Sequence, residues 1–235
     1  MDSPSSTDKQ SSSKTIMGTG IGNMVEWYDW NVYATFAAYF STQLFSRDDP
    51  GSAFLQTMAV FAVGFVARPM GGYLFGWIGD RLGRKPALTL SIVFAAAGSL
   101  IIGLTPTYEQ IGWLASLALV IARIVQGLAH GGELPAAQTY LVEHAPRERR
   151  GFFSSSIYVS GTIGILLGLL LGVGLQTALD EQQMQAWGWR VPFIVSVLLL
   201  GVSVWIRMQL NESPLFQQMK AEGKTSKAPL TESFL

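Results

Sequence analysis

Ionisable side chains occur inside long apolar stretches of this sequence, where a charge is unusual and points to a function. They are Glu26, Asp29, Arg68, Arg123, His130 and Glu133. Charged groups within hydrophobic spans face a cavity or a partner, so these residues are candidates for a buried site. Because burial favours the neutral form of a carboxylic acid, the acids are candidates to carry a proton. The arginines are candidates to bind a carboxylate, either of a substrate or of these acids.

Two of the acids lie in the apolar stretch at about residues 16–45. At 100° per residue, one face of a helix here contains Asn23, Glu26, Trp30 and Tyr33, with Asp29 at its border. Glu26 would lie roughly 15 Å from the start of the helix, near the middle of a bilayer core of about 30 Å. The alternative is a helix end at the headgroups, with the aromatic residues in an interfacial belt.

A second polar face occurs at about residues 111–141. One arc of about 120° on a helix here contains Arg123, Gln126, Gly127, His130, Glu133 and Leu134. Exposure of this arc to lipid would be very costly, so we expect it to face the interior. The functional interpretation is a substrate or proton site. The alternative is an internal pair of Arg123 with Glu133, beside a core histidine whose hydrogen bonds are satisfied.

Arg68 lies in the inner half of the apolar stretch at residues 54–78. It is too far from both ends of that stretch to be an ordinary surface residue. Its side chain could extend toward the membrane surface, but a carboxylate partner or a substrate is the favoured interpretation.

The composition identifies the class of protein that carries these residues. Of the 235 residues 49% are hydrophobic and only 14% are charged, whereas soluble domains have about 25% charged residues. This predicts an integral membrane protein. The net charge of zero suggests no nucleic-acid partner. The absence of cysteine excludes thiolate metal sites, and with two histidines and no nucleophile–base pair we expect neither a cofactor nor an enzyme.

Six apolar stretches are long enough to be membrane spans, at about residues 16–45, 54–78, 86–104, 111–141, 152–179 and 187–210. The fold class is therefore an all-α membrane protein with six transmembrane helices. The span at 86–104 has no ionisable group and is predicted to be scaffold. In the span at 152–179, Gly164, Gly168 and Gly172 recur at every fourth position, which is typical of close helix packing.

The basic residues predict the orientation of these spans. One side would carry Lys9, Lys14, Arg81, Arg84, Lys85, Arg147, Arg149, Arg150, Arg207, Lys220, Lys224 and Lys227, and the other only Arg47 and Arg190. Both termini are thus predicted to be cytoplasmic. We expect residues 1–15 to be a disordered tail and residues 211–235 to be a cytoplasmic segment with one or two helical turns at 215–220.

A basic loop between the second and third spans has the most distinctive pattern. Its residues include Gly76, Asp80, Arg81, Gly83, Arg84, Lys85 and Pro86. The glycines would permit a tight turn, and Pro86 would open the next helix. An acid such as Asp80 at a helix C-terminus opposes the helix dipole, so it needs a basic or N–H partner. The loop is either an ordinary topology signal or a charged latch that holds two helix ends together in one conformation.

This loop resembles the signature loop of the major facilitator superfamily, with every defined position filled by Gly76, Asp80, Arg81, Gly83, Arg84 and Lys85. The segment from Arg123 to Gly127 resembles the superfamily's fourth-span motif, in which the arginine is associated with proton coupling. The proline-glycine-glycine cluster of the antiporters is absent from the fifth span, which favours symport or uniport.

Further stretches narrow the resemblance to the metabolite:proton symporter family, namely residues 22–29, 68–72, 131–133 and 187–193. Members of that family transport compounds such as α-ketoglutarate, proline or betaine, and have twelve spans in two halves. The resemblance implies that this chain is an N-terminal half in the plasma (inner) membrane, paired with a second six-helix half. It also implies proton-coupled symport of a small organic acid or a zwitterion by alternating access, with the substrate near the midplane. A truncated half without transport activity is the remaining alternative.

Overall fold

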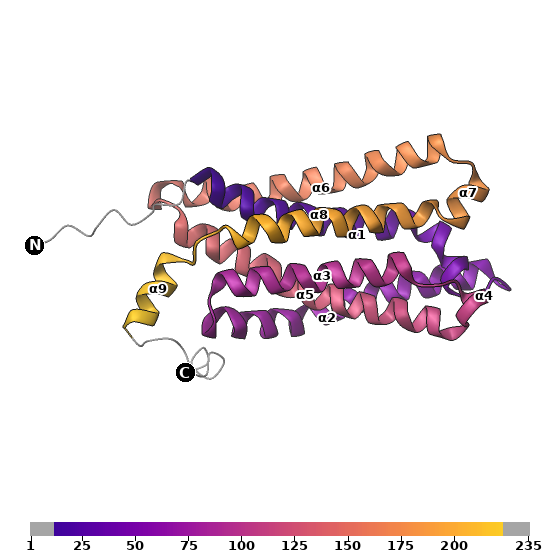
Figure 1. Cartoon of the computed structure of the whole chain (residues 1–235), viewed down its shortest axis with the longest axis horizontal. Coiled ribbons are helices and arrows are strands. Elements are labelled where there is room, and N and C mark those ends of the chain that lie inside the picture. Colours follow the sequence, from indigo (N-terminus) through magenta and orange to yellow (C-terminus); the bar gives the residue numbers. More distant parts are fainter. Residues whose placement is uncertain (1–11, 223–235) are drawn as a thin grey trace, which may run out of the picture.

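The structure is a computed structural model that describes residues 12–222. Within this range six long helices run along the molecule (Figure 1): α1 (Ser12–Leu44), α2 (Pro50–Arg81), α3 (Arg84–Leu104), α5 (Trp113–His144), α6 (Arg150–Ala178) and α8 (Val191–Met208). All except α1 are long and apolar enough to cross a membrane. For α6 and α8 the crossing segment also includes the short helix that precedes each of them. The all-helical fold is confirmed, and the crossing by α1 stays a prediction because its sequence is richer in polar residues.

The prediction that residues 1–15 are disordered is wrong for residues 12–15, which form the start of α1. The remaining residues of that segment, 1–11, lie outside the described residues. Helix α1 begins at Ser12, because its first turns already pack into the bundle. Thr15 is 1% exposed, and its carbonyl accepts a hydrogen bond of 2.8 Å from the Thr19 hydroxyl. The short amphipathic helix at 215–220 is confirmed as α9 (Pro214–Ala221), while residues 223–235 are outside the described range.

The connections between the long helices contain short helical elements. They are α4 (Tyr108–Ile111) and α7 (Glu181–Ala186), with 3-10 turns η1 (Arg147–Arg149) and η2 (Gly188–Arg190). Both α4 and α7 begin with a capping box, formed by Thr107 with Gln110 and by Asp180 with Gln183. This reciprocal capping stabilises even a single helical turn, which explains why these connections are helical.

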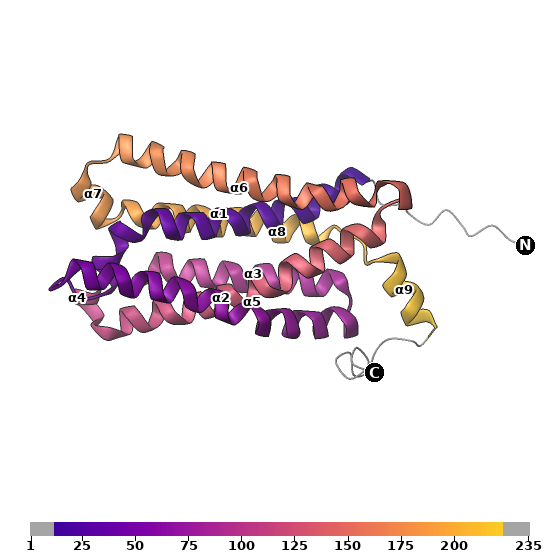
Figure 2. The ribbon, with the colours of Figure 1, turned by 180° about the vertical axis from the view of Figure 1, so that it is seen from behind.

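The long helices form two groups that pack against each other. Helix α1 packs most extensively on α6 and α8, while α5 packs on α2 and α3, and α3 joins the groups by packing on α8. Two views from opposite sides show α4 and α7 at one end of the bundle, and α9 with the start of α1 at the other (Figures 1 and 2). Helices α1 and α5, which carry the predicted site, therefore contact neighbours on several sides.

Glycines bring the backbones unusually close at two crossings. On α6, a Cβ atom at Gly164 would lie 2.0 Å from the carbonyl oxygen of Met24 on α1, so the predicted glycine stripe packs as expected. On α5, a Cβ atom at Gly131 would lie 1.8 Å from the carbonyl oxygen of Arg68 on α2. The second crossing places Arg68 directly beside the polar arc of α5.

Candidate functional site

Asp29 lies in the centre of the bundle and has hydrogen-bond donors from three neighbouring helices. Its Oδ1 accepts from the hydroxyls of Ser99 on α3, at 2.6 Å, and Ser196 on α8, at 2.8 Å. Its Oδ2 accepts from the amide of Gln126 on α5, at 2.5 Å. Helix α3 is thus more than scaffold. The serines were missed by sequence reasoning because nothing in an apolar span distinguishes a partner of a carboxylate from a packing residue.

Arg123 is fully buried in an aromatic enclosure and does not pair with Glu133. Its guanidinium lies 4.0 Å from the ring centre of Trp30 and 4.3 Å from that of Tyr33. Its Nη1 donates to the side-chain oxygen of Gln126 at 2.8 Å, whereas Nε and Nη2 have no hydrogen-bond partner among the described residues. Gln126 therefore links Arg123 to Asp29, because its amide oxygen accepts from Arg123 and its amide nitrogen donates to Asp29.

Arg68 reaches the same indole ring from α2. Its guanidinium lies 4.3 Å from the ring centre of Trp30 and 4.4 Å from that of Phe65. No carboxylate among residues 12–222 lies within ion-pair distance of it, and its side chain is only partly buried. Of the two arginines that contact Trp30, Arg68 is the one open to an anion from outside the bundle.

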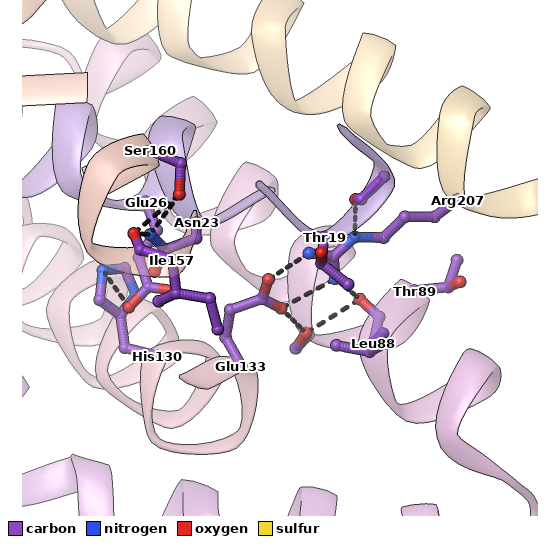
Figure 3. A network of polar contacts seen from close by, with 12 residues as sticks. Thr19, Asn23, Glu26, Leu88, Thr89, His130, Glu133, Ile157, Ser160 and Arg207 are labelled. Carbon is purple, nitrogen blue, oxygen red and sulfur yellow. Dashed lines mark hydrogen bonds and ion pairs between the residues drawn. The ribbon is translucent and has the colours of Figure 1, made fainter. Parts of the chain in front are cut away.

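Glu133 forms a buried ion pair with Arg207 of α8 (Figure 3). The two carboxylate oxygens accept from Nη2 and Nη1 of Arg207, the latter at 2.9 Å, and Ser91 donates to Oε2 at 2.7 Å. Arg207 also donates to the carbonyl of Leu88 at 2.6 Å and to that of Gly18 at 3.3 Å. Neither charged group of the pair lacks compensation.

The placement of Arg207 corrects a prediction, because it had been counted among the basic surface residues of one membrane side. It is 0% exposed. Its spacing from Ser196, Leu200 and Ser203 places it on the buried face of α8. That helical periodicity is the feature of the sequence that could have indicated a buried Arg207.

Glu26 faces α5, where its Oε1 lies 3.5 Å from Nε2 of His130 (Figure 3). This separation is outside hydrogen-bond range, and neither Glu26 Oε2 nor His130 Nε2 has a hydrogen-bond partner within the described part of the chain. Asn23 turns instead to α6, where it donates to the carbonyl of Ile157 at 2.6 Å and to Ser160. The predicted face of α1 is thus divided between two neighbours. The described residues contain no group of three or more side chains that could hold a metal ion.

The predicted latch has its expected ion pair, with Arg84 Nη1 at 2.7 Å from Asp80 Oδ1. Glu212, between α8 and α9, accepts from the backbone N–H groups of Arg84, at 2.9 Å, and Lys85, at 3.2 Å. Lys85 Nζ donates to the carbonyl of Met208 at 2.7 Å. Glu212 therefore caps the start of α3, and the loop is tied to the end of α8 as well as to α2.

Two details of the loop differ from the prediction. Gly76 lies within α2, and the turn is made by Gly83 alone, which has a φ of 116°. Helix α3 begins at Arg84, two residues before Pro86, because Glu212 supplies the acceptor that a helix start needs. Arg81 lies over Trp77, with 4.8 Å between the guanidinium and the ring centre.

Comparison with known proteins identifies the family. Residues 15–233 match the model of the sugar (and other) transporter family. The chain belongs to this family of the major facilitator superfamily. It is thus related to transporters and not to enzymes. The resemblance seen in the signature loop is confirmed.

Curated relatives are similar across most of this chain. It is 43% identical to the alpha-ketoglutarate permease of Escherichia coli over 84% of its own length and 46% of the permease. It is 39% identical to a putative proline/betaine transporter of Staphylococcus haemolyticus, over 89% of this chain and 45% of that protein. The chain spans about half the length of the curated relatives it matches.

Solved structures share the fold. A partially occluded, inward-open conformation of the E. coli xylose transporter XylE matches with a TM-score of 0.80 and 19% identity, over 91% of this chain and 51% of that one. At this identity the likeness concerns the fold alone, and it places the helices of this chain in half of a major-facilitator fold.

Proposed function

We propose that this chain is the N-terminal six-helix half of a plasma (inner) membrane symporter, which moves a small organic acid such as α-ketoglutarate together with a proton by alternating access. In this arrangement α1 also crosses the membrane, which brings the number of membrane-spanning helices to six. Both ends of the chain are cytoplasmic, because the end of the bundle with α9 carries Arg81, Arg84, Lys85, Arg147, Arg149, Arg150 and Lys220. A second six-helix half completes the substrate site near the midplane.

The observation that carries the proposal is the pair of arginines at Trp30. Arg68 has no carboxylate partner among residues 12–222 and is partly exposed, so it is the group that contacts a substrate carboxylate. Arg123 is enclosed by rings and cannot reach a substrate in this conformation. Its role is to add positive charge behind Trp30 and to act on Asp29 through Gln126.

The proton in this proposal is carried by Glu26. Glu133 is held by Arg207, and the two oxygens of Asp29 accept hydrogen bonds from Ser99, Ser196 and Gln126. One oxygen of Glu26 has no hydrogen-bond partner in residues 12–222, so its ionised form is the least compensated of the three acids.

The loop at residues 76–85 acts as the conformational latch. The Asp80–Arg84 pair and the hydrogen bonds that Glu212 accepts hold the ends of α2, α3 and α8 together in the conformation seen here. Alternating access would require part of this set to change when the other conformation forms.

The alternative function is symport of a zwitterion of the proline or betaine type, supported by the 39% identical relative. A zwitterion also has a carboxylate for Arg68, so the site does not separate the two substrates. A truncated half without independent transport activity is the other possibility.

The test is uptake by the gene product that carries this chain, reconstituted in vesicles with labelled α-ketoglutarate, proline and betaine. We expect accumulation of α-ketoglutarate against its gradient when an inward proton gradient is applied, and its loss when a protonophore is added. Accumulation of betaine or proline instead would favour the alternative substrate class. An inserted protein that moves none of them under any gradient would contradict the proposal.

A further inference from the structure

The side chain of Arg68 is fixed at its base and open at its tip. Its backbone lies at the tight crossing of α2 and α5, where a Cβ atom at Gly131 would be 1.8 Å from the Arg68 carbonyl oxygen. Of the guanidinium nitrogens, Nε is the one that is buried without a hydrogen-bond partner among residues 12–222. The two Nη groups are therefore the accessible end of this side chain.

Two aromatic rings support the guanidinium of Arg68, and we call Trp30 and Phe65 the ring pair. The guanidinium carbon lies 4.3 Å from the ring centre of Trp30 and 4.4 Å from that of Phe65. The two ring centres are themselves only 4.4 Å apart, with an angle of 60° between the ring planes. Rings on opposite faces of a guanidinium would be much farther from each other. Both rings therefore lie on the same side of Arg68, and the opposite side is clear of them.

The two members of the ring pair differ in what else holds them. Trp30 is 5% exposed, with the guanidinium of Arg123 at 4.0 Å and the ring of Phe61 at 5.0 Å from its ring centre. Phe65 is 45% exposed. Trp30 is thus a fixed part of the bundle, whereas Phe65 covers the guanidinium from the surface of α2 and contributes little to the core.

We propose that Phe65 is a positioning residue for substrate binding, which together with Trp30 holds the guanidinium of Arg68 so that its two Nη groups bind one carboxylate of the substrate. Two neighbouring N–H groups of the planar guanidinium match the two oxygens of a carboxylate. This inference rests on the proposed function, because it takes Arg68 as the residue that contacts the substrate.

The ring pair suits this task better than an acidic partner would. The faces of aromatic rings attract a guanidinium through their quadrupole, so they stabilise the charge of Arg68 without neutralising it. A carboxylate partner would have to be displaced before a substrate could bind. Holding the flexible side chain in place before binding also lowers the entropy that is lost when the substrate is bound.

The first test compares Phe65→Leu, which removes the ring, with Phe65→Tyr, which keeps it. The gene product that carries this chain is reconstituted in vesicles with whichever labelled compound the wild type accumulates, α-ketoglutarate, proline or betaine. We expect Phe65→Leu to raise KM by about three- to thirtyfold, the size of one cation–π contact, with little change in the maximal rate. Phe65→Tyr should have the KM of the wild type.

The matched control is Phe54→Leu, the same substitution on the same helix. Phe54 is 40% exposed, and the cation–ring contacts within residues 12–222 do not include it. It is also about 20 Å along the helix from Arg68. We expect an unchanged KM for this variant. An equal rise in KM for Phe54→Leu and Phe65→Leu would show a general effect of the α2 surface and overturn the proposal.

Combination with Arg68→Gln separates the inference from the proposed function. Arg68→Gln should raise KM by itself, and Phe65→Leu should then add nothing further. If Arg68→Gln raises KM but Phe65→Leu does not, or if Phe65→Leu has the same effect with and without Arg68, the positioning role is wrong and the substrate contact of Arg68 stands. If Arg68→Gln leaves KM unchanged, the substrate contact in the proposed function is wrong.

A measurement without substrate tests the ring pair directly. Thermal unfolding in nanodiscs is compared for the wild type, Phe65→Leu, Arg68→Gln and the double variant. Because the two side chains are in contact, we expect the two shifts in unfolding temperature not to add, whereas those of Phe54→Leu and Arg68→Gln should add. Additive shifts for Phe65→Leu and Arg68→Gln would overturn the proposal. Non-additive shifts in a protein that moves none of the labelled compounds would contradict only the proposed symport.

Discussion

Glu133 and Glu26 are both buried in the bundle, yet their burial is compensated in opposite ways. Glu133 accepts two hydrogen bonds from Arg207 and one from Ser91, so all of its charge is compensated. Of the residues that the structure describes, only His130 lies within ion-pair distance of Glu26, at 3.5 Å, and one oxygen of Glu26 has no hydrogen-bond partner there. A buried carboxylate with a complete set of donors cannot take up a proton without disrupting them, whereas an incompletely bonded one can.

In our proposal Glu133 is a structural acid and Glu26, on the neighbouring helix α1, is a functional one. The Glu133–Arg207 pair ties α5 to α8 and, through Leu88 and Gly18, to α3 and α1. Glu26 ties α1 to α5 only weakly. We therefore expect changes at the first acid to affect stability, and changes at the second to affect transport.

The largest effect on stability should come from Glu133→Gln, which leaves the buried Arg207 without its charge partner. We expect a loss of about 3–5 kcal/mol, because an unpaired buried charge is far costlier than a missing pair. Thermal unfolding in detergent or nanodiscs measures this. The double change Glu133→Gln with Arg207→Met should recover part of the loss. Equal stability of the wild type and Glu133→Gln would show that the pair is not structural.

Gly22→Ala should have the next largest effect. A Cβ atom at Gly22 would lie 1.9 Å from Nη2 of Arg207 and 2.9 Å from Oε1 of Glu133. The methyl group forces α1 away from the pair, and overpacking of this kind costs about 1–3 kcal/mol. Gly201→Ala, which meets nothing within 4 Å, is the control. If both alanine variants unfold at the same temperature, the tight approach of α1 to the pair is not required.

Glu26→Gln should barely change stability, by less than about 1 kcal/mol, because it replaces a poorly compensated charge by a group of the same shape. It should nevertheless abolish proton-driven uphill uptake while part of the substrate exchange remains. Both activities are measured on the gene product that carries this chain. Normal uphill uptake by this variant would remove Glu26 from the proton path and leave Asp29 and Glu133 as the candidates.

The smallest effect on stability should come from Asp80→Asn in the latch. The Asp80–Arg84 pair is partly exposed, at 34% and 23% of the side chains, so its loss costs less than about 1 kcal/mol. We expect instead a changed balance between inward-open and outward-open conformations. The chain has no cysteine, so a single cysteine introduced on the face that lines the substrate pathway can report, through its labelling rate, how accessible that pathway is to a thiol reagent. An unchanged labelling rate would reduce the loop to a topology signal.

Much of this protein could be predicted from its amino-acid sequence alone. Apolar stretches of the right length predict the helices, and the loop with Asp80 and Arg84 indicates the family. Helical periodicity places Arg123, His130 and Glu133 in one arc of α5, and all three are buried. These features depend on length, local spacing and composition, which are properties of the chain itself.

Only the tertiary structure decided which of these groups meet. Periodicity places Glu133 on a stripe of its helix, but the partner of that stripe depends on the rotation of α8, which brings Arg207 to it in place of Arg123. In the same way Asp29 meets Ser99 only because the packing of α1 and α3 brings these two residues to the same height along the bundle. The physical reason is that a helix determines the direction of its own side chains, whereas the packing of all helices together determines what lies opposite.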